Sequence, residues 1–325
     1  MLKRPDQFKG LVTLHPDLQR IVDNLEIVVV GKHRLMEYMV TAMLAGGHVL
    51  LDDVPGVGKT TIAKTLAKST GLEYRRIQCT PDLLPSDITG VTIFHPGTHQ
   101  FEFQPGPIFT HLVLADEINR TSPRSQSALL EVMEESQVTV DGITHPMSLP
   151  FLVVATQNPI EYEGTFPLPE SQLDRFLFRL TIGYPGVEEE SKILAQSQAR
   201  SQVDTLSAVM GRERILQLMA ESAAIHVTDS IRRYIAEIAF ATRKSPHLYL
   251  GLSPRGSIAL YHAAQAWALL HNRSYVIPDD IIELAPHVVE HRLIVSRTTA
   301  SQSRERVHEV FNDIIHAIPV PSTSS

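Results

Sequence analysis

The chain has 325 residues, which is long enough for two domains and a large hydrophobic core. Hydrophobic residues make up 43% of it and charged residues 20%, as is ordinary for a soluble globular protein. The 29 basic and 36 acidic residues give a net charge of −7. This balance argues against a protein whose main task is to neutralise nucleic-acid phosphates.

Cysteine content and hydropathy bound the cellular location. Cys79 is the single cysteine, so an internal disulfide is excluded and a reducing compartment is favoured. The N-terminal stretch MLKRPDQFKG lacks the apolar segment of a signal peptide. No run approaches the roughly 18 apolar residues that a membrane span requires. We therefore expect a cytoplasmic protein without a membrane span.

The first part of the chain predicts helices around one strand. Residues 11–47 carry apolar side chains three and four positions apart, which is typical of helices. The short apolar run GHVLLDD (47–53) is typical of a strand buried in a parallel sheet. Residues 60–71 follow with helical periodicity and end on Gly71, which is a good helix stop.

Further strands and helices alternate after this point. The apolar runs that resemble strands are 74–79, 111–117, 151–157 and 176–182. A helical stretch at 122–136 separates two of them. The alternation predicts an α/β domain over residues 1–186, with a doubly wound parallel sheet between helices.

The sequence also predicts two insertions in the α/β domain and a helical second domain. Residues 91–103 and 137–149 each have strand-type residues around a glycine-containing turn, which predicts two β-hairpin inserts. Residues 187–317 are helical in pattern and predict a smaller all-helical domain. Residues 318–325 have little to bury and are expected to be a disordered tail.

A phosphate-binding loop follows the first strand. DVPGVGKT (53–60) fits the pattern Gly-x-x-x-x-Gly-Lys-Ser/Thr except at its first position, which is Asp53. The glycines let backbone N–H groups turn toward phosphate oxygens, and the following helix adds its positive end. Lys59 is placed to reach the β- and γ-phosphates and Thr60 to offer its hydroxyl to Mg²⁺. The predicted nucleotide-binding residues are Pro55, Gly56, Val57, Gly58, Lys59, Thr60 and Thr61.

Asp53 departs from the usual glycine. Aspartate is one of the few residues that adopt a left-handed backbone conformation at modest cost, so it can replace a glycine in a turn. A carboxylate that pointed toward the phosphates would be unfavourable. We therefore expect the Asp53 side chain to point away from the nucleotide.

Polar residues end two further strands. In HLVLADEIN, Asp116 is placed to hold Mg²⁺ and Glu117 to polarise an attacking water. In FLVVATQNP, Asn158 can orient that water by a hydrogen bond. Acid pairs alone are common as helix caps, but one that follows a phosphate loop by about sixty residues indicates nucleotide hydrolysis.

Arginines in two segments are candidates for stabilising charge in the transition state. LPESQLDRFLFRL carries Arg175 and Arg179, and the spacing leaves open which of them acts. In GLSPRGSIAL, Ser253 and Pro254 predict a helix start with Arg255 just inside it. The positive end of a helix disfavours a cation, so a phosphate partner would explain Arg255.

With these motifs in order, the chain resembles AAA+ ATPases of the MoxR family over residues 10–295. The likeness is carried by VVVGKHRLMEYMVTAMLAGGHVLLDDVPGVGKT (28–60), including the acid at the first loop position. It implies that Asp116 and Glu117 form the Walker B pair and that Asn158 is the first sensor. It also implies that Arg175 is an arginine finger for the neighbouring subunit. Arg255 would be a second sensor that reaches the phosphates of its own subunit. Val29, Val30 and Gly31 would line the adenine pocket.

The resemblance also implies partners and a use for ATP and Mg²⁺. The hairpins match the helix-2 insert and the pre-sensor-1 hairpin, and such family members form ring hexamers. MoxR relatives act as chaperone-like motors beside von Willebrand factor A domain proteins, in assembly, maturation or metal and cofactor loading of a target complex. The hairpin residues expected to contact a client are Phe94, His95, Phe101 and Phe103, although packing within the subunit is an equal alternative.

Three other functions share many of these motifs. An MCM-like nucleic-acid motor is disfavoured because neither hairpin contains Lys or Arg. A metal-chelatase ATPase subunit would need a chelating partner that one sequence cannot display. A non-catalytic, nucleotide-gated scaffold is disfavoured by the intact Glu117 and Asn158.

Overall fold

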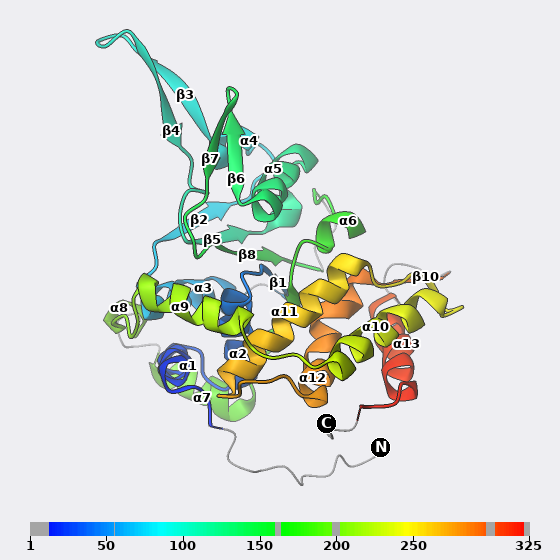
Figure 1. Ribbon diagram of the computed structural model, residues 1–325. Helices are drawn as coiled ribbons and strands as arrows, with labels where there is room; N and C mark the ends of the chain where they lie inside the picture. The colour runs from blue at the N-terminus through cyan, green and yellow to red at the C-terminus, as the bar shows by residue number, and fades with distance from the viewer. Residues whose placement is uncertain (1–12, 55, 160–163, 197–201, 297–302, 322–325) are drawn as a thin grey trace.

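A five-stranded parallel sheet forms the centre of the computed structural model, which describes residues 13–54, 56–159, 164–196, 202–296 and 303–321 (Figure 1). The strands in spatial order are β2 (Tyr74–Gln78), β5 (Leu112–Asp116), β8 (Leu152–Gln157), β1 (Val49–Asp52) and β9 (Phe178–Leu180). All four pairings are parallel. The carboxyl ends of the strands therefore meet at one edge of the sheet, and the amino ends at the other.

Helices cover both faces of the sheet, as expected for a doubly wound domain. They are α1 (Pro16–Val28), α2 (His33–Leu44), α3 (Lys59–Thr70), α4 (Pro85–Thr89), α5 (Pro123–Glu135) and α6 (Glu170–Leu173). Side chains of β1 alternate between two cores: Val49 and Leu51 join one cluster with α1–α3, and Leu50 joins the other with α5. This alternation explains why the strand reads as a continuous apolar run.

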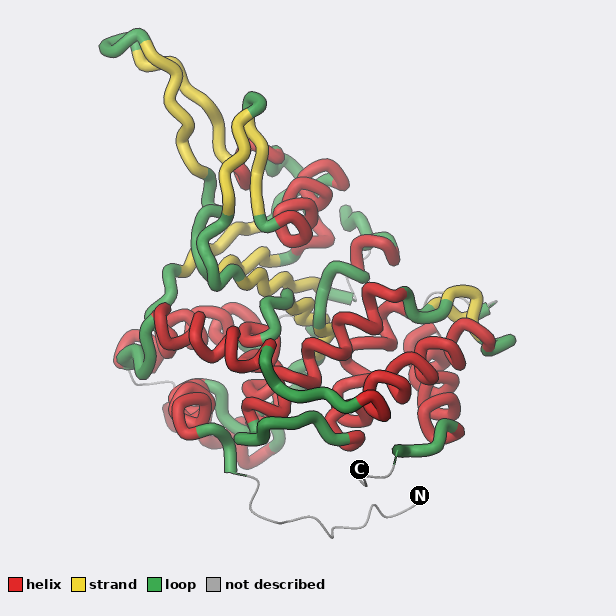
Figure 2. The backbone as a smooth tube through the Cα atoms, viewed as in Figure 1, coloured by secondary structure: helices red, strands yellow, loops and turns green. Residues whose placement is uncertain are grey.

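Both predicted hairpins are confirmed and lie side by side, projecting from the sheet domain (Figures 1 and 2). The first pairs β3 (Gly90–His95) with β4 (Gln100–Pro105), and the second pairs β6 (Gln137–Val140) with β7 (Ile143–Pro146). Phe103 stacks on His145 with ring centroids 4.1 Å apart, which joins the two hairpins. Their bases therefore support one another.

The second part of the chain is helical, as predicted. Its helices are α7 (Val187–Gln196), α8 (Gln202–Thr205), α9 (Arg212–Ala223), α10 (Asp229–Lys244), α11 (Pro254–Leu270), α12 (Pro278–Val289) and α13 (Ser303–Ala317). A short antiparallel pair, β10 (Leu248–Leu250) and β11 (Ile294–Val295), adds to the prediction. Neither strand exceeds three residues, so the pattern alone could not show this pairing. Within the described ranges, no helix is both long enough and apolar enough to cross a membrane.

The helical part packs on the sheet domain through α2. Tyr38 of α2 stacks on Trp267 of α11, with ring centroids 5.3 Å apart. Its hydroxyl donates a hydrogen bond of 2.8 Å to Glu283 of α12. Leucine, isoleucine and alanine side chains of α11 and α12 join the same hydrophobic core as α1 to α3. These contacts fix where α11 begins relative to the sheet.

His48 lies directly before β1 at the amino edge of the sheet. Its Nε2 donates to the backbone oxygen of Met133 at 3.0 Å, and its Nδ1 accepts from the backbone N–H of Val153 at 3.0 Å. Burial lowers the pKa of His48 to about 4, and the nearby charge of Arg255 contributes in the same direction. The imidazole is therefore neutral in the folded protein, because a proton on Nδ1 would face the N–H of Val153.

This neutral histidine should make folding stability depend on pH. An unfolded histidine has a pKa of about 6.5, so the unfolded state binds the proton first as the pH falls. Stability should consequently decrease from about pH 6.5 to about pH 4, by roughly 3 kcal/mol in total. His48→Gln removes the titrating group. The free energy of unfolding of the wild type minus that of this variant should therefore decrease as the pH falls from about 6.5 to about 4. Denaturant titrations from pH 4.5 to 8 measure it, and a difference independent of pH would contradict the account.

Candidate active site

The phosphate loop lies between β1 and α3 at the carboxyl edge of the sheet. Gly56 and Gly58 have φ values of 86° and 92°, a conformation that glycine adopts without strain. A Cβ added at either glycine would meet no atom within 4 Å, so the space beside both glycines is unoccupied. Lys59 is the first residue of α3, and Thr60 and Thr61 follow it in the first turn. The turn and the helix N-terminus therefore fit a phosphate group. Pro55 lies outside the described residues.

The Asp53 carboxylate lies against the chain that follows β9. Its Oδ2 accepts backbone N–H bonds from Ile182 at 2.7 Å and Gly183 at 2.6 Å, and its Oδ1 accepts from Val54 at 2.8 Å. Asp53 is not among the residues with a positive φ, so the left-handed backbone suggested by its glycine position is wrong. Through these hydrogen bonds, the buried Asp53 carboxylate connects the start of the loop to the chain that follows β9.

Lys59 lies between the ends of β1 and β8. Its Nζ donates to the backbone oxygens of Asp53 and, at 3.0 Å, of Gln157. Burial lowers its pKa, which the nearby Asp53 partly offsets. Both acceptors are neutral, so a phosphate oxygen would be a stronger partner for this ammonium group.

Asp116 ends β5 and contacts the phosphate loop. Its Oδ2 accepts from Thr60 Oγ1 at 3.4 Å and from Arg76 Nη2 at 2.6 Å, and its Oδ1 accepts from Thr156 Oγ1 at 2.7 Å. Arg76 and Thr156 were not among the predicted site residues. Their positions on β2 and β8, the strands on either side of β5, were the available signal.

Glu117 follows Asp116 in a left-handed conformation with φ 59°. A non-glycine residue there costs about 1–2 kcal/mol, and such strain tends to collect at functional sites. Its Oε2 accepts from Gln78 Nε2 and pairs with Arg120 Nη1, both at 3.2 Å, and its N–H donates to Thr156. Gln78 and Arg120 were likewise not among the predicted site residues.

Asn158 and the predicted adenine segment complete this edge. Asn158 directly follows β8, the strand between β5 and β1, so it lies between Glu117 and the phosphate loop. Val29, Val30 and Gly31 connect α1 to α2. Lys32, the next residue, donates to the backbone oxygen of Tyr184 at 3.1 Å. The chain after β9 therefore contacts both the adenine segment and, through Asp53, the phosphate loop.

Among the described residues, none of the three candidate arginines pairs with a residue of the phosphate loop. Arg179 sits within β9 and donates to Asp52 Oδ2 through Nε at 2.8 Å, so it forms an ion pair inside its own subunit. Arg175 precedes β9, at the amino edge of the sheet, and its Nε lies 3.0 Å from Glu134 Oε2. Arg255 Nη1 lies 2.5 Å from Glu134 Oε1.

Arg255 therefore does not reach the phosphate loop of its own subunit, and that expectation is wrong for this structure. Ser253 caps α11 as predicted, accepting from the Gly256 N–H at 3.1 Å. However, α11 begins beside the end of α5 and near His48, at the amino edge of the sheet. The packing of α11 on α2 places it there, and no local sequence signal reports such a contact.

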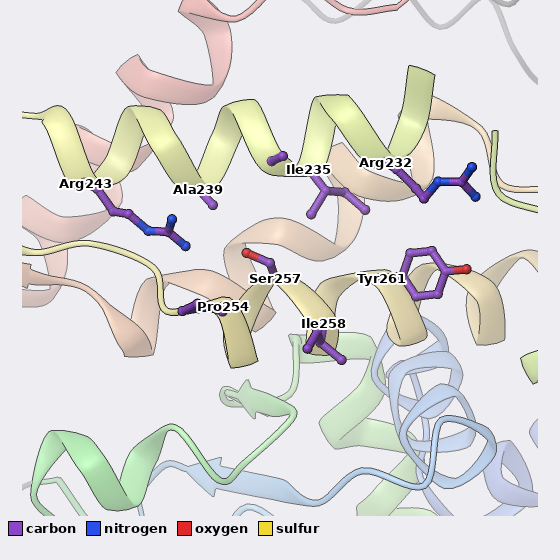
Figure 3. Close-up of a pocket in the computed structure, with 9 residues that line it drawn as sticks. Arg232, Ile235, Ala239, Arg243, Pro254, Ser257, Ile258 and Tyr261 are labelled. Carbon is purple, nitrogen blue, oxygen red and sulfur yellow. The ribbon is translucent and has the colours of Figure 1, made fainter. Parts of the chain in front are cut away.

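A separate hollow of about 360 Å³ lies between α10 and α11. Figure 3 shows Arg232 and Arg243 at its two ends and the apolar side chains of Ile235, Ala239 and Ile258 between them. None of the residues that line it belongs to the phosphate loop. The hollow is thus part of the surface of the helical domain, distinct from the carboxyl-edge site.

Comparison with known protein families agrees with this geometry. Residues 48–178 match the model of the ATPase family associated with various cellular activities (AAA), and residues 240–314 match that of the AAA lid domain. The fold and the site thus define an AAA+ ATPase, a protein that binds and hydrolyses ATP.

Individual relatives show to which family of AAA+ ATPases the chain belongs. The chain is 52% identical over 308 residues to the uncharacterized protein YeaC of Bacillus subtilis, covering 95% of this chain and 96% of the relative. It is 39% identical over 331 residues to the chaperone MoxR1 of Mycobacterium tuberculosis, covering 99% and 87%. A crystal structure of a protein assigned as an ATPase from Cytophaga hutchinsonii superposes with a TM-score of 0.86 at 36% identity, covering 94% of this chain and 95% of that one. The chain belongs to the MoxR family of AAA+ ATPases.

Proposed function

We propose that this MoxR-family ATPase is a chaperone motor that uses ATP hydrolysis to assemble, mature or load metal or cofactor into a target protein complex. The observation that carries the proposal is the gathering of Lys59, Asp116, Glu117 and Asn158 at one edge of the sheet, around a phosphate-binding turn. The name of the chaperone relative MoxR1 supports the use of that ATPase activity on another protein.

The chemistry follows from the positions of these side chains. Backbone N–H groups of the loop and Lys59 would hold the phosphates, and Val29, Val30 and Gly31 would line the adenine pocket, by likeness to the family. Water attacks the γ-phosphorus and gives its proton to Glu117, while the bond from the γ-phosphorus to the ADP oxygen breaks. Asn158 orients the attacking water. Arg120 and Gln78 hold the Glu117 carboxylate in place.

Thr60 and Asp116 fit a Mg²⁺ ion. Their hydroxyl and carboxylate oxygens lie 3.4 Å apart beside the loop, and Mg²⁺ prefers oxygen ligands of this kind. A bound Mg²⁺ would neutralise charge on the β- and γ-phosphate oxygens.

Arg175 and Arg255 would act on the nucleotide of a neighbouring subunit. Both lie at the amino edge of the sheet, whereas the phosphate loop lies at the carboxyl edge. Head-to-tail packing of identical subunits brings one edge against the other and closes into a ring. Because AAA+ ATPases typically form rings, we propose such a ring, with six subunits, as the active form. A von Willebrand factor A domain protein is the proposed partner, by likeness to the family.

The first hairpin carries the proposed client-binding surface. Phe94 and Phe101 are 48% and 75% exposed, and their ring centroids lie 5.2 Å apart. His95 pairs with Glu102 at 3.0 Å. Phe103 instead packs on His145 and Phe109 of its own subunit. For this residue, packing within the subunit is therefore favoured over contact with a client. An exposed aromatic pair on a projecting hairpin is suited to contact an apolar segment of another protein.

Steady-state ATP hydrolysis per subunit, measured over a wide range of protein concentration, tests the proposal. The rate should rise with concentration, because a neighbour completes each site. Glu117→Gln should bind ATP normally but turn over roughly 10²- to 10⁴-fold more slowly, since it lacks the base. Undiminished turnover in Glu117→Gln would contradict the assignment of the base. A constant rate from a protein that is monomeric at the lowest concentration would contradict the shared site.

A further inference from the structure

Glu134 pairs with both of the arginines that are proposed to act on a neighbouring subunit. Its Oε2 lies 3.0 Å from Arg175 Nε, and its Oε1 lies 2.5 Å from Arg255 Nη1. The three residues come from the end of α5, from the segment before β9 and from the start of α11. One carboxylate therefore connects the sheet domain to the helical domain at the edge that presents both arginines.

The contacts leave most arginine donors available. A guanidinium has five N–H donors, and Arg175 uses Nε, so both of its terminal nitrogens can still donate to a phosphate. Among the described residues, Glu134 is the only acid paired with either arginine. The side chains of Arg175 and Arg255 are 26% and 44% exposed, so both can be approached from outside.

The negative charge of Glu134 can hold the two arginine side chains close together. Two guanidinium groups that converge on one point repel each other, and the carboxylate between them offsets this repulsion. Without that carboxylate, the two side chains would separate and sample many rotamers. An arginine acts on a transition state only when it is held in position, and a displacement of about 1 Å can cost roughly 10²-fold in rate.

We propose that Glu134 is a positioning residue that holds Arg175 and Arg255 together for the γ-phosphate of the neighbouring subunit. The inference rests on the proposed function, in which these arginines act between subunits. It assigns the positioning of both arginines to a residue at the end of α5, away from the phosphate loop.

Glu134→Gln tests the proposal, because it removes the charge and keeps the size of the side chain. Turnover at saturating ATP should fall roughly 10- to 100-fold. The KM for ATP should stay unchanged, because the phosphate loop of each subunit is intact. Glu134→Asp keeps the charge on a shorter stem and should recover part of the rate. Glu135→Gln is the matched control: Glu135 is the exposed next residue on α5, and its turnover should equal that of the wild type.

Mixed assemblies locate the defect. A Glu134→Gln subunit has an intact Glu117, and a Glu117→Gln subunit has intact arginines and Glu134. Mixing the two impaired variants should raise turnover above that of either variant alone, at the interfaces where the intact parts meet. Arg175→Ala mixed with Glu117→Gln is the reference. Thermal unfolding of each variant checks that the subunits are folded.

Three results would overturn the role of Glu134. The first is unchanged or faster turnover in Glu134→Gln, the latter meaning that the carboxylate competes with phosphate for the arginines. The second is a raised KM with full turnover. The third is that Glu134→Gln fails to complement Glu117→Gln while Arg175→Ala succeeds. If neither mixture recovers activity, the shared site of the proposed function fails as well.

Discussion

Arg175→Ala is expected to lower ATP turnover by roughly 10³- to 10⁵-fold while leaving ATP binding intact. Arg175 lies at the amino edge of the sheet, so its loss leaves the phosphate loop of the same subunit unchanged. The arginine stabilises charge that develops on the γ-phosphate in the transition state, and the ground state gains little from it. The turnover should therefore fall without a matching change in KM.

Single-turnover hydrolysis and a fluorescent-nucleotide binding titration would measure the two effects separately. Arg124→Ala is a suitable control, because Arg124 is an exposed arginine in the first turn of α5 and its loss changes the net charge equally. Arg175→Ala subunits should regain activity when mixed with Glu117→Gln subunits. Weakened ATP binding in Arg175→Ala would instead indicate a role in the subunit's own site.

Lys59→Ala should strongly weaken ATP binding. Lys59 is the cation at the phosphate loop, held by the backbone oxygens of Asp53 and Gln157. Removing a charged partner from a largely desolvated phosphate typically costs about 2–5 kcal/mol, which is roughly 30- to 4,000-fold in affinity. Both backbone acceptors are at strand ends and can turn to water, so we expect the fold to persist.

Isothermal titration with ATP and Mg²⁺ is the direct measurement for Lys59→Ala. Lys64→Ala provides the comparison, since Lys64 lies on the same helix and, within the described part of the chain, pairs only with exposed Asp204 at 3.0 Å. Its affinity for ATP should match that of the wild type. If Lys59→Ala binds ATP as tightly as the wild type, the assignment of the phosphate loop is wrong.

The sequence predicted the sheet domain and most of its carboxyl-edge site because the signals there are local. Buried parallel strands appear as short apolar runs, and the residues that end them share one edge whatever the rest of the chain does. Lys59, Asp116, Glu117 and Asn158 each follow or end such a strand. The two hairpins were equally visible, since a turn and its flanking strands are neighbours in sequence.

Only the tertiary structure decided the environment of Asp53 and the location of Arg255. Asp53 binds N–H groups some 130 residues further along the chain, at the end of β9. Arg255 lies where the packing of α11 on α2 places it, beside a glutamate of α5. These contacts join segments distant in sequence, and they depend on how the helical domain docks on the sheet. Strand patterns and motif spacing determine which residues belong to an edge, but the docking of whole elements determines which edge a lid arginine faces.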